Sequence, residues 1–420
     1  MRLRLSLLMF LLYAVAGAWI PVFTLRLTEL AFSHIEIGWV CASSALASLV
    51  GPFVAGQVAD RWFPAQRCVA CCAFVGGSLL WLLAELTVPA TVFWTALAFW
   101  LVMVPATTLT ISICFAHLDD PERSYGPVRM WGTVGWVVPG LLLGVWFAEP
   151  PAVASFLAWL RPHAPRSEWA DALRLGGLIA FVLSAYALTL PHTPPTRRRK
   201  GTATSWLAPL AALRLLRKRS VAVYCACALA GCVAIPFSSQ LTSLLLQHLG
   251  VSRALIMPML TIAQSMEIVT LATLPLILLR CGVRGTMLLG LFAWALALTV
   301  LAIGEPAEVV IASLGLNGVF ICCFLVAGQV FVNNRARGDI RASSQALLTF
   351  VNGAGLLIGN VLVGCVREQA GGAFGPTFAT AAGFAAFALL LFTFGFTDPA
   401  EVAPSPQRPP GPLVPARKMT

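Results

Sequence analysis

Runs of about twenty apolar residues recur along the whole sequence, and they constrain its fold more than any other feature. A helix needs about twenty apolar residues to cross the hydrocarbon core of a bilayer. Only 11% of the 420 residues are charged, against roughly 25% in soluble domains. The sequence therefore predicts an all-α membrane protein with twelve transmembrane helices. The predicted spans are 6–26, 37–58, 68–88, 91–115, 129–148, 172–191, 220–244, 254–279, 284–303, 307–332, 343–366 and 374–396.

A basic segment, 192–219, divides these runs into six and six, and it holds eight of the lysines and arginines. Two related halves are typical of secondary transporters, whose substrate lies near the midplane at the interface of the repeats. We therefore expect an N-terminal six-helix half at 1–191, a basic cytoplasmic linker at 192–219 and a C-terminal six-helix half at 220–397. The Pro-rich tail, 398–420, is predicted to be disordered.

Lysines and arginines are distributed unevenly between the two sides of the predicted bundle. With the N-terminus inside, 22 of the 28 fall on the cytoplasmic side. Cytoplasmic loops of membrane proteins carry such an excess. Both termini are therefore predicted in the cytoplasm, in a plasma or inner membrane. The same distribution accounts for the net charge of +11 without nucleic acid as a partner.

One carboxylate, that of Glu267, lies at the middle of the predicted span 254–279, too far from either end to reach water. Gln264 precedes it by three residues and shares its helix face. A charge within a span marks a substrate or proton pathway by default, although a bond to a neighbouring helix would also satisfy it. We predict that Glu267 binds substrate, a proton or both, beside Gln264. Ser238 and Asn317 are further candidates for substrate contact, since polar side chains in a span need partners.

A second group of polar and aromatic side chains lies at the start of the span 129–148. Arg129, Thr133 and Trp136 are spaced i, i+4 and i+7, which places them on one helix face. The arginine alone also fits an anchor at the membrane surface. With a hydroxyl and an indole beside it, the group suits a ligand that carries hydroxyls or carbonyls on a flat ring. Sugars and nucleosides both have this chemistry.

The string "GQVADRW" ends the span 37–58 in a G-x-x-x-D-R pattern. Gly56 permits close approach of a neighbouring helix. Asp60 is unfavourable at a helix C-terminus, so we expect it to pair with Arg61 or with the positive end of another helix. The pattern indicates a conformational gate or brace rather than a substrate site.

The sequence holds no motif of an enzyme, an ATP-driven pump or a metal centre. The strings G-x-S-x-G, H-E-x-x-H and G-x-x-x-x-G-K-[ST] do not occur. The twelve cysteines lie in or at the ends of apolar runs, where cysteine is a small apolar packing residue. We expect no enzymatic activity, cofactor or metal, and transport would run on a gradient rather than on ATP.

The sequence resembles the nucleoside:proton symporter family of the major facilitator superfamily over nearly its whole length. The strings that carry the resemblance are "ADRWFPAQ", "VRMWGTVGW", "LTLPHTP", "AQSMEIVTLATLPLILLRCGVRGTML" and "GQVFVNNRARGDIRASSQALLTFVNGAG". The resemblance implies a nucleoside pocket that includes Arg129, Thr133, Gln264 and Glu267. Trp136 lies where the family has an aromatic residue.

The chain departs from the family pattern on two spans. The family has amides where this chain has Ile235 and Ser238, an acid where it has Cys322, and an aromatic residue where it has Asn317. Glu267 would then be the remaining acid at the midplane. The span 129–148 also resembles oligosaccharide:proton symporters through its "YGPVRMWGTVGW" string.

These observations predict a secondary active transporter that imports nucleosides with protons by alternating access and works as a monomer. Its expected partners are a nucleoside, a proton and the lipid bilayer. A sugar or oligosaccharide symporter, an uncoupled nucleoside facilitator and a non-transporting sensor remain alternatives.

Overall fold

The computed structural model describes residues 1–58, 64–118, 121–148, 168–193, 216–335 and 341–397, and its regular structure there is helical. The N-terminal helices are α1 (Arg2–Trp19), a 3₁₀ turn (Ile20–Val22), α2 (Phe23–Glu29), α3 (His34–Val58), α4 (Ala65–Glu85), α5 (Pro89–His117), α6 (Pro121–Phe147) and α8 (Glu168–Leu188). The C-terminal helices are α10 (Arg219–His248), α11 (Arg253–Ile303), α12 (Ala307–Ser313), α13 (Gly315–Phe320), a π-helical turn (Ile321–Val326), α14 (Ala327–Arg335), α15 (Arg341–Gln369) and α16 (Phe374–Gly395). The predicted all-α class is confirmed.

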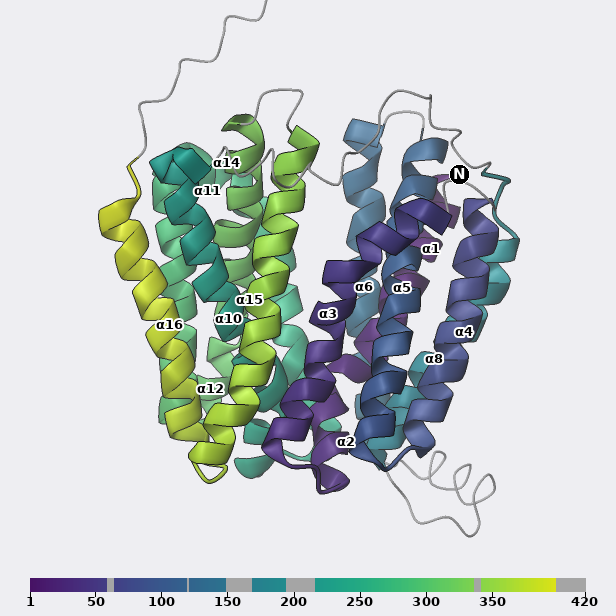
Figure 1. Cartoon of the computed structure of the whole chain (residues 1–420), viewed down its shortest axis with the longest axis horizontal. Coiled ribbons are helices and arrows are strands. Elements are labelled where there is room, and N and C mark those ends of the chain that lie inside the picture. The colour runs from purple at the N-terminus through teal and green to yellow at the C-terminus, as the bar shows by residue number, and fades with distance from the viewer. Residues whose placement is uncertain (59–63, 119–120, 149–167, 194–215, 336–340, 398–420) are drawn as a thin grey trace, which may run out of the picture.

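Figure 1 shows two helix bundles side by side, one formed by the helices up to α8 and the other by α10 to α16. In the described part of the chain, ten helices are long and apolar enough to cross a membrane. One of them, the 51-residue α11, joins two predicted spans across a bend at Gly282. The predicted span 37–58 lies on α3, which is not among the ten. Each predicted span thus lies on helical chain, while most of the linker 192–219 and the tail 398–420 lie outside the described residues.

Glycines bring the first helix of the N-terminal bundle into backbone contact with α6. A Cβ built on Gly17 would overlap the backbone oxygen of Trp136, and one on Gly135 would overlap that of Phe10. Small residues allow such close approach between membrane helices, where packing drives association. This contact fixes the level of Trp136 relative to α1.

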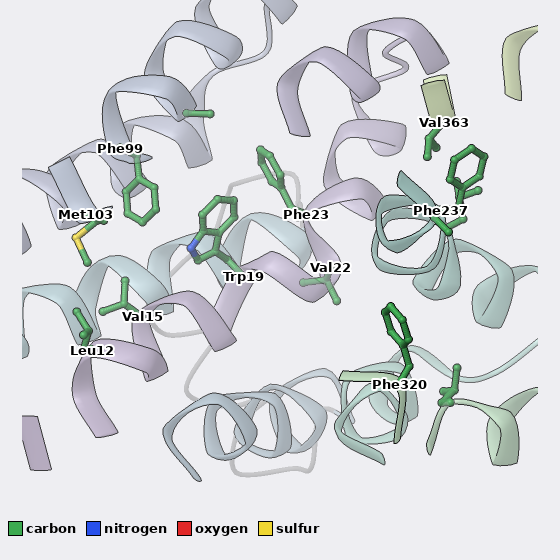
Figure 2. Close-up of a cluster of buried hydrophobic side chains, with 14 of the residues drawn as sticks. Leu12, Val15, Trp19, Val22, Phe23, Phe99, Met103, Phe237, Phe320 and Val363 are labelled. Atoms are coloured by element: carbon green, nitrogen blue, oxygen red, sulfur yellow. The ribbon is translucent and has the colours of Figure 1, made fainter. Parts of the chain in front are cut away.

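The core of the N-terminal bundle is aromatic around Trp19 (Figure 2). Its ring meets Phe23 and Phe99 edge-on, with centroids 4.8 and 5.4 Å apart. Edge-to-face pairs of this kind contribute about 0.5–1.5 kcal/mol beyond their burial. They hold α1, α2 and α5 together beside the interface between the halves.

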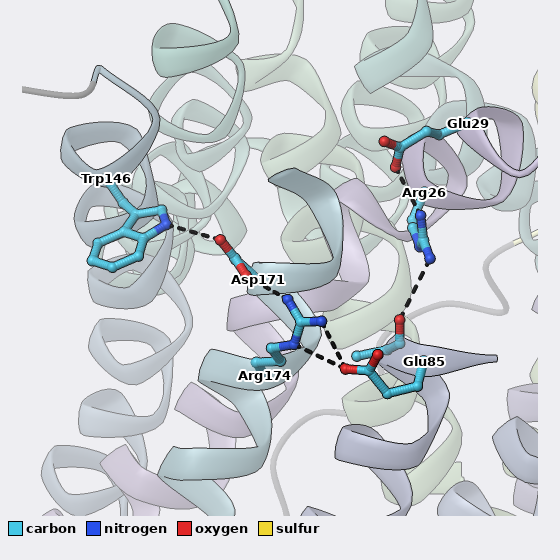
Figure 3. A network of polar contacts seen from close by, with 7 residues as sticks. Arg26, Glu29, Glu85, Trp146, Asp171 and Arg174 are labelled. Atoms are coloured by element: carbon cyan, nitrogen blue, oxygen red, sulfur yellow. Dashed lines mark hydrogen bonds and ion pairs between the residues drawn. The ribbon is translucent and has the colours of Figure 1, made fainter. Parts of the chain in front are cut away.

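An ionic network connects three helices of the same bundle (Figure 3). Arg174 on α8 donates to Glu85 on α4 at 2.7 Å and to Asp171 at 2.8 Å. The indole of Trp146 on α6 donates to the second oxygen of Asp171 at 3.3 Å. Partly buried charged groups such as Arg174 and Asp171 are stable when paired and hydrogen-bonded. We name Glu85, Trp146, Asp171 and Arg174 the Arg174 network.

Hydrogen bonds join the two bundles near α2, at the opposite end of the molecule from the N-terminus (Figure 1). The hydroxyl of Thr24 on α2 donates to the backbone oxygen of Gln240 on α10 at 2.8 Å. It also lies 3.3 Å from the hydroxyl of Ser243. These contacts hold this end of the interface together.

The first turns of α3 pack on the last turns of α15 at the same end. A Cβ on Gly38 would lie 2.7 Å from the backbone oxygen of Asn360, and one on Gly364 would lie 2.5 Å from that of His34. Both distances are too short for any side chain, so the two backbones lie in direct contact. The orientation predicted from the lysines and arginines would make this the non-cytoplasmic side.

Candidate substrate-binding site

A cavity of about 120 Å³ lies between the two bundles. Both bundles contribute to its wall. The lining residues are Gly17, Ile20, Pro21, Trp136, Gly140, Ser238, Ser239, Thr242, Met257, Leu260, Thr261, Ala263, Gln264, Trp294, Ala297, Leu301, Ser313, Leu314 and Asn317. Trp136, Gln264, Asn317 and Ser238 are among the residues predicted to contact substrate, so the fold brings four of the seven together.

The helices α6 and α11 cross beside this cavity. A Cβ on Gly144 would lie 2.7 Å from the ring of Pro258, and one on Gly140 would lie 3.4 Å from the methyl of Thr261. The small residues of α6 therefore let α11 approach closely. The crossing places Trp136 and Gln264 on one cavity although they come from different halves.

Asn317 supplies an acceptor that no described residue uses. Its Oδ1 is buried and receives no hydrogen bond within the described part of the chain. A buried acceptor without a partner costs about 1–3 kcal/mol. A ligand with a donor at this position would remove that cost, which is how a transporter gains affinity from a polar group in an apolar wall.

Glu267 lies on α11 three residues beyond Gln264, half-buried and outside the set of lining residues. The backbone of α13 packs directly against the backbone of Glu267, since a Cβ on Gly318 would lie 2.5 Å from the Glu267 nitrogen. The thiol of Cys322 donates to the Glu267 backbone oxygen at 3.3 Å. Cys322 belongs to the π-helical turn, and such turns occur frequently at functional sites.

Arg129 and Thr133 also lie on α6 outside the set of lining residues. The Arg129 guanidinium stacks over the ring of Tyr13 on α1, 4.2 Å from its centroid, a cation–π contact. Its positive charge acts on Glu267 across the interface between the halves. The residues predicted to share one face of α6 therefore have different surroundings. Trp136 lines the cavity, whereas Arg129 packs on Tyr13.

The three residues predicted to form a gate are described only in part. Gly56 lies near the end of α3, whereas Asp60 and Arg61 lie outside the described residues. The predicted role of this pattern stays a prediction.

Several hydroxyl groups in the cavity wall were not among the residues predicted to contact substrate. Thr242, Thr261 and Ser313 line it, and the Thr261 hydroxyl donates to the Pro258 backbone oxygen at 2.6 Å. Thr261 has one signal in the sequence, since it precedes Gln264 by three residues on the same face. Thr242 and Ser313 have no comparable signal, because serine and threonine are common in membrane helices.

The chain matches known proteins over nearly its full length. The family model described as "Nucleoside H+ symporter" matches residues 1–401. A putative nucleoside transporter of Escherichia coli, YegT, is 30% identical over 87% of this chain and 84% of its own. The xanthosine permease of the same organism is 26% identical over 94% of this chain and 95% of its own.

Solved structures of transporters have the same fold. The nucleoside transporter NupG superposes with a TM-score of 0.81 at 23% identity, over 94% of this chain and 99% of its own. A bacterial homolog of the human lysosomal transporter Spinster, in an inward-facing and unoccupied conformation, gives a TM-score of 0.73 at 15% identity, over 94% of this chain and 96% of its own. The predicted family and the predicted transporter class are confirmed, and the chain belongs to the nucleoside:proton symporter family.

Proposed function

We propose that this transporter imports nucleosides together with protons, through a site between its halves that is exposed to each side in turn. The cavity walled by both halves carries this proposal, since Trp136, Gln264 and Asn317 all line it. The Oδ1 of Asn317 receives no hydrogen bond from the described residues. A nucleoside has a flat base with donors and acceptors at its edge. An aromatic face and a few placed amides suit such a ligand. The nucleoside and xanthosine transporters similar to this chain support the same substrate class.

The volume of the cavity supports alternating access. At about 120 Å³, it is smaller than the roughly 300–1,000 Å³ of sites that enclose drug-sized ligands. A nucleoside would therefore enter only after the halves part. We propose that Arg129 and Thr133 then join Trp136 around the substrate, since all three lie within two turns of one another on α6.

Glu267 is the proposed proton carrier. Its carboxylate is half-buried within a span and lies within range of the Arg129 charge. Movement of one half against the other would change that electrostatic interaction, and with it the proton affinity of Glu267. The uncoupled facilitator is the second candidate, because Cys322 provides a thiol where the family pattern has an acid.

Further features complete the proposal. We infer that the Gly56, Asp60 and Arg61 pattern gates or braces the cytoplasmic end. We also infer that both termini lie in the cytoplasm, that the membrane is the inner or plasma membrane, and that the transporter works as a monomer without enzymatic activity.

Uptake of labelled uridine tests the proposal, in cells that lack their own nucleoside transporters and express this chain. Accumulation that a protonophore abolishes is the expected result. Uptake that equilibrates without accumulation would identify the facilitator instead. Uptake that lactose inhibits and thymidine does not would favour the sugar symporter, and a chain that reaches the membrane but carries none of these would contradict the proposal.

A further inference from the structure

A second cavity, of about 140 Å³, lies between the halves beside the first. The two cavities share Ile20 and Ser239 in their walls. The other residues that line the second cavity are Trp19, Phe23, Thr24, Val40, Cys41, Ser44, Trp100, Pro236, Gln240, Leu356 and Asn360. It therefore borders the contacts near α2 that hold the bundles together, and neither Glu267 nor Arg129 belongs to it.

One part of this wall is aromatic. The rings of Trp19 and Trp100 lie 5.9 Å apart between centroids, and Phe23 adjoins Trp19 on the side of the interface (Figure 2). Aromatic side chains provide flat apolar surface on which a planar ring can stack. This part of the wall therefore favours a flat, unsaturated ligand.

Another part of the wall carries two buried amides with unused hydrogen-bonding capacity. Gln240 is only 3% exposed, and its Oε1 receives no hydrogen bond from the described residues. Its Nε2 donates to the Asn360 Oδ1 at 2.6 Å, and the Asn360 Nδ2 donates to the Leu356 backbone oxygen at 2.7 Å. Each amide nitrogen has a second hydrogen. The pair thus brings one acceptor and further donors to a cavity that is also lined by aromatic side chains.

The volume sets the size of the occupant. A cavity of about 150 Å³ in another protein holds one benzene molecule, so 140 Å³ suits a single six-membered ring. An amide carries an acceptor oxygen and donor hydrogens, which can complement the donors and acceptors at the edge of a pyrimidine, and aromatic side chains stack on nucleobases. We propose that this cavity is a second binding site, for a pyrimidine base, distinct from the cavity that borders Gln264 and Asn317. This proposal stands without nucleoside import, since it concerns binding and not transport.

Binding of labelled uracil to the purified full-length chain in lipid nanodiscs tests the proposal. Ser44 lines the second cavity and not the first. The larger side chain of Ser44→Leu would fill the second cavity. Ser48 lies one turn further along α3, its hydroxyl donating to the Ser44 backbone oxygen at 2.8 Å, and it lines neither cavity. Ser48→Leu is therefore the matched control. We expect saturable uracil binding to the wild type and to Ser48→Leu, and a loss of about tenfold or more in Ser44→Leu, because overfilling a packed site is unfavourable.

Two further variants keep the test decisive. Cys41→Phe fills the same cavity from another position and should also abolish binding, in case Ser44→Leu fails to fold. Gln264→Leu alters the first cavity and should leave uracil binding intact. Absence of saturable uracil binding to the wild type would overturn the proposal, and so would binding that survives both filling variants or disappears with Gln264→Leu.

Uridine distinguishes the source of the base. If uridine displaces bound uracil from the wild type, and Ser44→Leu binds neither ligand at this site, the site takes the base of a nucleoside. Retention of uracil at saturating uridine would show that it takes the free base. Either result supports a pyrimidine site, and uptake measurements decide the proposed transport function separately.

Discussion

Gly318 on α13 lies so close to Glu267 on α11 that a Cβ at the glycine would stand 2.5 Å from the glutamate nitrogen. Two helix backbones therefore touch at the level of the one carboxylate that the sequence places at the middle of a span. Asn317, the neighbour of this glycine, borders the cavity. The position of α13 thus sets both the depth of Glu267 and the wall of the candidate site.

Gly318→Ala is expected to reduce uridine uptake about tenfold, since an added methyl in a packed contact costs about 1–3 kcal/mol and displaces the backbone. The measurement is initial uptake rate normalised to the protein in the membrane. Gly315→Ala is the matched control, because a Cβ at Gly315 meets its nearest atom, on Met266, at an ordinary 3.5 Å. An equal loss of uptake rate in both variants would show that the contact of Gly318 with Glu267 is not the cause of the loss.

Asn317→Leu is expected to raise the KM for uridine about tenfold, because the ligand would lose a hydrogen bond to a buried amide. Asn352→Leu controls for stability, since the Asn352 Oδ1 is equally buried without a described partner but lines neither cavity. Concentration dependence of uptake separates KM from maximal rate. A raised KM in both variants would argue against a substrate contact at Asn317.

Glu267→Gln is expected to abolish accumulation against a gradient while retaining exchange of labelled for unlabelled uridine. The amide keeps the shape of the side chain but cannot release a proton at physiological pH. Uptake into reconstituted vesicles measures accumulation, and counterflow in the same vesicles measures exchange. Accumulation by the variant that still collapses with a protonophore would remove Glu267 from the proton pathway.

His34 lies at the contact between α3 and α15 and is expected to make that contact sensitive to acid. Burial lowers the pKa of His34 from its usual value of 6.5 and the charge of Arg367 lowers it further, with Glu368 opposing. A lowered pKa in the closed state means that protonation favours the parted state, so the closed end loses stability as the pH falls through the range where His34 titrates. Hydrogen exchange of α3 and α15 should therefore quicken as the pH falls below about 6.5, the usual pKa of the imidazole.

His34→Gln is the matching control for this pH effect. The glutamine carries no titrating group, so exchange in α3 and α15 should lose most of its pH dependence after correction for intrinsic rates. A variant that keeps the full dependence would assign it to other groups at this end.

The helices were predictable from the sequence because the bilayer requires long apolar runs. The break between the spans 254–279 and 284–303 was predictable too, since Arg280 and Arg284 mark a membrane boundary. The structure has its bend there, where Gly282 adopts a positive φ of 63°. Glu267 and Gln264 stood out because charge and amide are rare at such depth. These are properties of single segments.

The arrangement of the candidate site was not predictable in the same way. Whether Arg129 faces the cavity or Tyr13 depends on how α1 and α6 rotate against each other, and the spacing of residues on one helix does not fix that. Gly318 gave no signal, because glycine is common in membrane helices. The unpartnered amides of Asn317 and Gln240 became visible only once their neighbours were known.

The hydrogen bonds of the Arg174 network join α4, α6 and α8 within one bundle. We therefore expect its geometry to stay the same when the transporter opens at one end of the interface between the halves and closes at the other. An antibody fragment raised against the rim around Glu85 and Asp171 would then bind every conformation alike. Such a reagent would serve as a fixed marker for imaging the transport cycle, where a fragment against the contacts near α2 would instead trap one state.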